Sequence, residues 1–191
     1  MRPHLAEPAP MTIEEFLEFC EGRPDDERWE LIEGVAVMNA SPVDVHQAIC
    51  ANLIYGLLKA KIEKNASWRP MPGIGARVPT SPNSLPQPDV FVKAGALNLL
   101  PITDDALVLF EVLSKSNTKA DQAWRQKVYA SVPNCQHYVT VATKSITVVR
   151  YDRSANWKGA EIKGIKDTLD LPALDIALPL AEIYRWTPLV D

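Results

Sequence analysis

The chain of 191 residues has few cysteines and no long apolar run. Its three cysteines, Cys20, Cys50 and Cys135, show no spacing typical of zinc sites or disulfide frameworks, so we interpret them as thiols in a reducing compartment. No apolar stretch approaches the roughly 20 residues that span a bilayer, and the N-terminus lacks the basic-then-apolar plan of a signal peptide. These absences predict a cytoplasmic protein without a membrane segment.

Basic residues are not in excess either. The net charge of −4 argues against a protein that coats nucleic acid nonspecifically, because such proteins usually present a basic surface. An enzyme can still meet nucleic acid through a local basic patch and a metal ion, since net charge does not describe local fields.

Length and composition predict one folded domain. The hydrophobic share of 47% and the charged share of 23% are ordinary for a globular protein with a core. The first ten residues contain three prolines and no periodicity, which predicts a flexible arm over residues 1–10. We expect a single domain over residues 11–191.

The first half of the chain predicts a helix, a hairpin and a long helix. Thr12 and Glu15 form a capping box that opens a short helix. Two alternating runs flank Glu33-Gly34 and predict a β-hairpin. Ser41 as N-cap predicts a helix that continues to about Lys64. Pro42 is expected at its first position, and the apolar residues at helical spacing are Ile49, Leu53, Leu57 and Leu58.

The second half predicts strands around one further helix. Thr118 begins a second capping-box-like pattern, which predicts a helix to about Ala130. The apolar run that includes Glu111 is typical of a central strand covered on both faces. The expected strands are 74–80, 89–93, 106–114, 137–142 and 146–152. This order predicts one α/β domain.

Two carboxylates stand in apolar runs, Asp89 in QPDVFV and Glu111 in LVLFEVLS. An isolated buried carboxylate is costly, so such residues are usually paired, hydrogen-bonded or bound to a cation. The pattern indicates an acidic, metal-binding edge of a small sheet.

Several ordered motifs resemble one known family. They are WELIEG, SPVDVHQAI, PDVFV, EVLSKS, TKADQAWRQKVYASVPNCQHYVTV and LPLAEIY, and they cover residues 11–186. Together they are similar to the Uma-type restriction-endonuclease-like family, a branch of the PD-(D/E)XK nuclease superfamily. The resemblance implies a restriction-endonuclease-like core, in which a mixed central β-sheet is flanked by helices and carries a divalent-cation site at one edge.

The resemblance also implies roles for individual residues. Asp89 and Glu111 match the metal-ligand Asp and Glu of the family. Glu30 matches the acidic residue of the first hairpin, and His46 matches the histidine near the start of the long helix. Mg²⁺ or Mn²⁺ held by such oxygen ligands neutralises a phosphate and generates hydroxide.

The basic residue of the superfamily pattern is displaced in this chain. Leu113 stands two residues after Glu111, where the pattern has lysine. The family lysine falls on Arg125 of the following helix, with Lys127 two residues later. Two residues rotate a helical side chain by about 200°, so only one of the two can face the site. Arginine stays protonated and can clamp a phosphate but cannot act as a general base.

Structural interpretations compete with each assignment. Asp89 could cap a strand, and Glu30 could be the solvent-facing member of an alternating strand. His46 could be a hydrogen-bonded histidine at the edge of the core, and Arg125 could form an ordinary helical ion pair with Asp121. Lys127 could be a solvated helix residue.

The leading hypothesis is a Mg²⁺-dependent endonuclease that acts on DNA. Asp89 and Glu111 bind the cation, Glu30 assists, His46 tunes or contacts the site, and Arg125 or Lys127 orients the water or phosphate. The alternative is a weakened or inactive nuclease fold that serves as a nucleic-acid-binding or assembly module. A homodimer is expected, because C2 pairing is the commonest symmetry and lets each subunit address one strand.

Overall fold

The computed structural model describes residues 9–24, 26–114 and 117–190. The arm expected over residues 1–10 lies mostly outside this part of the chain. The helices are α1 (Ile13–Glu21), α2 (Asp44–Lys64), α3 (Lys119–Tyr129) and α4 (Leu180–Ile183), with short 3-10 turns η1 (Arg153–Ala155) and η2 (Pro172–Leu174). The strands are β1 (Trp29–Ile32), β2 (Val35–Met38), β3 (Arg69–Pro72), β4 (Gly75–Ala76), β5 (Val90–Lys93), β6 (Ile102–Thr103), β7 (Ala106–Leu113), β8 (His137–Ala142), β9 (Thr147–Asp152), β10 (Gly159–Lys163), β11 (Thr168–Leu171) and β12 (Ile176–Pro179).

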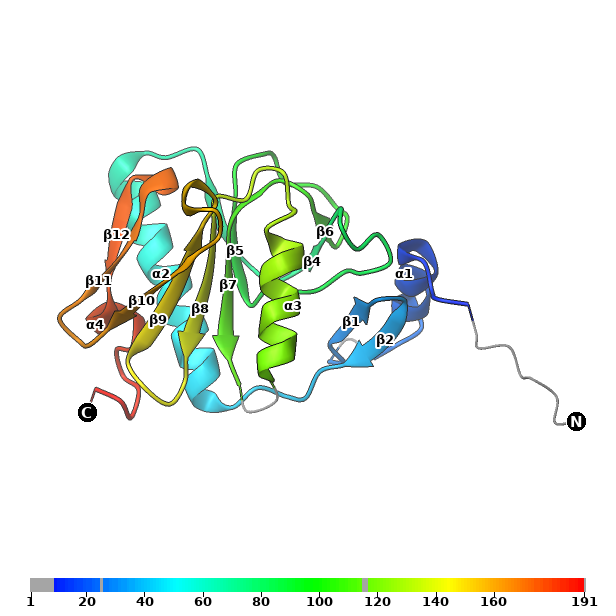
Figure 1. Cartoon of the computed structure of the whole chain (residues 1–191), viewed down its shortest axis with the longest axis horizontal. Coiled ribbons are helices and arrows are strands. Elements are labelled where there is room, and N and C mark those ends of the chain that lie inside the picture. Colours follow the sequence, from blue (N-terminus) through cyan, green and yellow to red (C-terminus); the bar gives the residue numbers. More distant parts are fainter. Residues whose placement is uncertain (1–8, 25, 115–116, 191) are drawn as a thin grey trace, which may run out of the picture.

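A six-stranded mixed sheet forms the centre of the molecule, in the order β10-β9-β8-β7-β5-β3. Strands β7 and β8 are parallel, and the other neighbours are antiparallel. Helix α3 connects the two parallel strands and lies on one face of the sheet, while α2 lies on the other (Figure 1). The expected α/β class with a mixed central sheet flanked by helices is confirmed.

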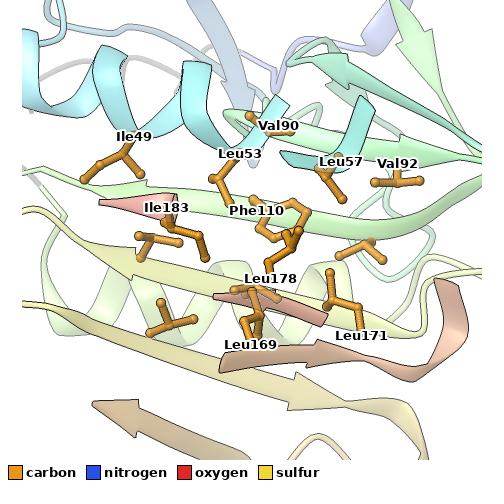
Figure 2. Close-up of a cluster of buried hydrophobic side chains, with 14 of the residues drawn as sticks. Ile49, Leu53, Leu57, Val90, Val92, Phe110, Leu169, Leu171, Leu178 and Ile183 are labelled. Carbon is orange, nitrogen blue, oxygen red and sulfur yellow. The ribbon is translucent and has the colours of Figure 1, made fainter. Parts of the chain in front are cut away.

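The larger core lies between the sheet, α2 and the C-terminal segment. Ile49, Leu53 and Leu57 of α2 point toward Val90 and Phe110 of the sheet (Figure 2). The hairpin β11–β12 and α4 close the same core from the side. Because apolar residues recur every third or fourth position in α2, one stripe of the helix is buried as far as Leu57.

The second core lies between the sheet and α3. It contains Phe91 and Leu109 from the sheet, Tyr129 from α3, and Tyr138 from β8. Alternate residues of β7 therefore point into the two cores, as expected for a strand that is covered on both faces. Glu111 shares the face of Leu109, so the strand directs its carboxylate toward α3.

The N-terminal unit is a short helix packed on a hairpin. The capping box is confirmed, since the Thr12 hydroxyl accepts the Glu15 N–H and the Glu15 carboxylate accepts the Thr12 N–H. Glu33 and Gly34 form the hairpin turn with φ of 50° and 82°, the left-handed region that favours glycine. Phe16 and Leu31 form a third, smaller core.

The start of the long helix was predicted wrongly. Helix α2 begins at Asp44, and its N-cap is Val43, in an extended conformation without a side-chain cap. Residues 39–43 must span from the hairpin to the far side of the sheet (Figure 1), and an extended chain covers about twice the distance per residue of a helix. Leu58, expected in the core, is 41% exposed.

Two strand predictions also need correction. Only Gly75 and Ala76 of the expected strand 74–80 are paired, with β6. Residues 69–72 form an edge strand instead, which tolerates Pro70 and Pro72 because one side of an edge strand needs no hydrogen-bond donors. Strand β10 follows Trp157, where no strand was predicted. That strand is held by its ladder with β9 rather than by burial.

The helices of the described ranges do not include one long and apolar enough to cross a membrane.

Stability is expected to fall as the pH drops below the ordinary pKa of histidine, because of His137. Its Nδ1 lies 2.6 Å from Asp152 Oδ1, and its Nε2 accepts the Ala173 N–H at 3.2 Å. Both contacts fit a neutral ring, and burial lowers the pKa of His137 below 6.5. The unfolded chain therefore binds the proton more readily than the folded chain, so stability is lost as the pH falls. Urea unfolding of the wild type and His137→Asn at neutral pH and about pH 5 measures this. The variant should show the smaller loss, and an equal loss in both proteins would contradict the assignment.

Candidate functional site

Asp89 and Glu111 come opposite each other on neighbouring strands. The register of β5 and β7 pairs Val90 with Phe110, so Asp89, which directly precedes β5, faces Glu111 across the ladder. The Asp89 N–H donates to the Phe110 carbonyl at 2.9 Å, and Asp89 Oδ2 accepts the Val112 N–H at 2.8 Å. The backbone of β7 therefore holds the Asp89 carboxylate beside Glu111.

Arg125 lies between two carboxylates from distant parts of the chain. Its Nη1 donates to Glu111 Oε1 at 3.1 Å and to Glu30 Oε1 at 3.0 Å, and its Nη2 donates to Glu30 Oε2 at 2.7 Å. Glu30 Oε1 also accepts the Gln87 N–H at 2.5 Å, and the Tyr129 hydroxyl donates to Glu111 Oε1 at 2.9 Å. Glu30, Glu111 and Arg125 are all less than 9% exposed. The guanidinium thus joins β1 to β7 from α3.

His46 connects Asp89 to a thiol. Its Nε2 lies 3.3 Å from Asp89 Oδ2, and its Nδ1 lies 3.7 Å from the Sγ of Cys50, one turn further along α2. One ligand atom from each of His46, Cys50 and Asp89 lies within 4.8 Å of the other two. The structure therefore contains a candidate metal-binding group at the start of α2.

Burial and charge perturb the protonation of Glu111. Burial raises its pKa from an ordinary 4.5 to about 8. The Arg125 charge opposes this rise, while the Asp89 and Glu30 charges add to it, and the Tyr129 hydrogen bond lowers it slightly. Burial also raises the pKa of Tyr129 well above 10, so its hydroxyl keeps the proton that it donates. In the absence of a cation, the Asp89 and Glu30 charges therefore disfavour ionisation of Glu111.

Two carboxylate oxygens are available to a cation. Within the described ranges, Asp89 Oδ1 and Glu111 Oε2 accept no hydrogen bond. Hard divalent cations prefer carboxylate oxygens, and the donor set at this edge fits one.

Comparison with known proteins gives the family. A model of the Uma2 family, described as "putative restriction endonuclease", matches residues 13–181. The chain belongs to the Uma2 family. A solved structure from Anabaena variabilis ATCC 29413, described as a putative nuclease belonging to DUF820, is similar in fold. Its TM-score is 0.73 at 15% identity, over 93% of this chain and 99% of that chain. No curated protein matches.

The residues predicted for the site of this Uma2-family chain separate into two groups. Glu30, His46, Asp89, Glu111 and Arg125 gather at the edge formed by β1, the start of α2 and the end of β7. Lys127 is exposed, because two residues along α3 turn its side chain away from Arg125. The helical ion pair with Asp121 is also present, since the Arg125 Nε lies 3.3 Å from Asp121 Oδ1.

Two further residues of the Uma2-family site were not predicted from the sequence. Cys50 was interpreted as a small buried residue, and its i, i+4 spacing from His46 was the available signal. Arg28 lies close enough to lower the pKa of the Cys50 thiol by its charge. It also lines a pocket of about 240 Å³ with Arg23 and Gln87. In the described ranges Arg28 forms no ion pair, and the loop before β1 gave no pattern that would single it out.

Proposed function

We propose that the protein is a divalent-cation-dependent endonuclease that hydrolyses phosphodiester bonds of DNA. The observation that carries this proposal is the facing pair Asp89 and Glu111, each with one oxygen that accepts no hydrogen bond within the described ranges. Membership in a family described as a putative restriction endonuclease supports it.

Asp89 and Glu111 would hold Mg²⁺ or Mn²⁺, which would neutralise the phosphate and acidify the attacking water. The other residues position these two. The Val112 N–H and His46 fix Asp89, while Tyr129 and Arg125 fix Glu111.

Glu30 acts through Arg125 rather than as a ligand. Both of its oxygens accept hydrogen bonds from the guanidinium. Arg125 is in turn shared by two carboxylates and keeps its proton. It therefore orients Glu111 and is not free to bind a phosphate.

Plasmid nicking tests the proposal. Purified wild-type protein is expected to convert supercoiled plasmid to the open circle in the presence of Mg²⁺ or Mn²⁺. Addition of a chelator should stop this reaction. Asp89→Asn keeps the shape of the side chain but removes its charge, and it should abolish the reaction. Asp121→Asn, which removes a carboxylate that contacts Arg125 from the more exposed side, is the matched control. Equal nicking by wild type and Asp89→Asn would disprove the assignment.

Arg28 is expected to bind the phosphate backbone of the substrate. It is the cation beside the His46, Cys50 and Asp89 group, and it has no ion-pair partner in the described ranges. Arg28→Ala should weaken duplex binding by about tenfold and flatten its salt dependence, because each neutralised phosphate releases counterions. Fluorescence anisotropy at two salt concentrations measures this. Arg77→Ala, at an exposed arginine, is the control, and equal weakening by both would refute a specific role.

A second candidate is a nuclease fold that binds nucleic acid without cleaving it. Leu113 replaces the pattern lysine, and no lysine of the described ranges forms an ion pair with Asp89 or Glu111. Calorimetric titration with Mn²⁺ separates the two, since a protein that has lost the chemistry would show no cation affinity. The endonuclease proposal includes a homodimer in which each subunit acts on one DNA strand. Light scattering can measure this oligomeric state.

A further inference from the structure

His46, Cys50 and Asp89 combine three kinds of donor atom at one place. His46 and Cys50 are one turn apart, so they share a face of α2. That face meets the end of the sheet where Asp89 stands. The imidazole nitrogens lie 3.7 Å from the Cys50 Sγ and 3.3 Å from Asp89 Oδ2.

This donor set differs in chemical class from the one formed by Asp89 and Glu111. Mg²⁺ and Ca²⁺ take oxygen ligands, whereas nitrogen and sulfur ligands select zinc and similar transition metals. We propose that His46, Cys50 and Asp89 form a site for a thiophilic transition-metal ion of the Zn²⁺ class. This site shares Asp89 with the proposed nuclease site, where His46 also positions the Asp89 carboxylate.

The geometry is close to that of a bound ion. One ligand atom from each residue lies within 4.8 Å of the others. Zinc bonds of about 2.0 to 2.3 Å in a tetrahedron place ligand atoms about 3.3 to 3.8 Å apart, so shifts of about 1 Å complete the site. Three protein ligands leave the fourth position open.

The environment also favours a cation. His46 and Cys50 are buried, while the Asp89 side chain is 13% exposed and provides an entry side. Among the side chains of the described ranges, only the His46 imidazole is a hydrogen-bonding partner of the Cys50 thiol. The thiol of Cys135 differs, because it donates to the His137 carbonyl inside the second core.

Because Asp89 belongs to both donor sets, occupancy of one site is coupled to occupancy of the other. A transition metal on His46 and Cys50 draws Asp89 Oδ2 toward itself. The Oδ1 atom accepts no hydrogen bond in the described ranges and so remains for the cation that Glu111 would share.

Cobalt titration of the chelator-treated protein tests the site without any activity measurement. Co²⁺ should give a sulfur-to-cobalt charge-transfer band in the near ultraviolet and visible bands of tetrahedral strength. Cys50→Ser should lose the charge-transfer band, and His46→Asn should weaken cobalt binding at least tenfold. Cys135→Ser, another buried cysteine, should keep the spectrum, and circular dichroism verifies that each variant is folded.

Glu111→Gln separates this site from the proposed function. It should keep the cobalt spectrum, because Glu111 is not one of the three ligands. If the wild type shows the charge-transfer band but never nicks DNA, the transition-metal site is supported and only the proposed nuclease function is refuted.

Absence of the band in the wild type, its survival in Cys50→Ser, or its loss in Glu111→Gln would overturn the site. X-ray absorption at the zinc edge of the wild type needs no variant. It should show one sulfur ligand at about 2.3 Å, and a shell of only nitrogen and oxygen would also overturn the proposal.

Discussion

Glu111→Gln is expected to abolish nicking while making the cation-free protein more stable at alkaline pH. The glutamine keeps an Oε1 that accepts from Tyr129 and Arg125, so the local hydrogen bonds survive. It loses the charged oxygen that would hold the cation. Removing a metal ligand forfeits several kcal/mol of transition-state stabilisation, and we expect a loss of about 100-fold or more in nicking rate.

The gain in stability follows from the pKa of Glu111. The folded protein holds that proton up to about pH 8, whereas an ordinary glutamate releases it near 4.5. Between these values the folded state binds more protons than the unfolded state, so stability falls as the pH rises. Glutamine does not titrate, so the variant avoids this loss, which above pH 8 is on the order of 5 kcal/mol.

Urea unfolding of the two proteins below and above this window measures the difference. The variant should unfold at a higher urea concentration than the wild type at about pH 9, and the two should converge at about pH 5. Glu33→Gln, on the hairpin turn with a contact to Trp124, is the control for loss of one negative charge. A variant that nicks normally, or whose midpoint moves in parallel with the wild type at every pH, would contradict this account of Glu111.

Arg125→Met should destabilise the protein by about 3–5 kcal/mol, because removing one partner of a buried ion pair leaves uncompensated charge. Here two carboxylates, Glu30 and Glu111, would lose their common cation. Glu30 loses more hydrogen bonds than Glu111, since both of its carboxylate oxygens accept from the guanidinium. Arg125→Lys should recover only part of the stability, because an ammonium cannot reproduce the two-pronged contact with Glu30.

Lys127→Met on the same helix is the matched control. Lys127 is exposed, so its replacement should change stability by no more than about 0.5 kcal/mol. The double variant Glu30→Gln with Arg125→Met should be more stable than Arg125→Met alone, since it removes one unpaired charge. Urea unfolding at neutral pH compares the four variants with the wild type, and equal midpoints for Arg125→Met and the wild type would exclude a structural role for the guanidinium.

Local signals accounted for most of the elements. Thr12 and Thr118 begin helices where their hydroxyls accept the N–H three residues on, and both caps could be predicted from the sequence. The run from Ala106 to Leu113 is long and apolar enough to require cover on both faces. The start of α2 was not readable, because the distance that residues 39–43 must span outweighed the preference of Ser41 for an N-cap.

The site was predictable as a set of residue types but not as a set of contacts. The cost of burying Asp89 and Glu111 marks them in the sequence, whatever they bind. Nothing in the sequence indicates that Glu30 pairs with Arg125, because 95 residues separate the two. The choice between Arg125 and Lys127 also depended on which face of α3 meets the sheet.

The sequence by itself determined the class of the fold, the family resemblance and the two carboxylates, because periodicity, capping and the penalty for buried charge act over short stretches of chain. The tertiary structure alone decided the partners. It placed one guanidinium between two carboxylates and set a thiol and an imidazole beside Asp89. Those contacts arise where α2, α3, β1 and β7 meet, and side chains from distant segments acquire partners only when the elements pack.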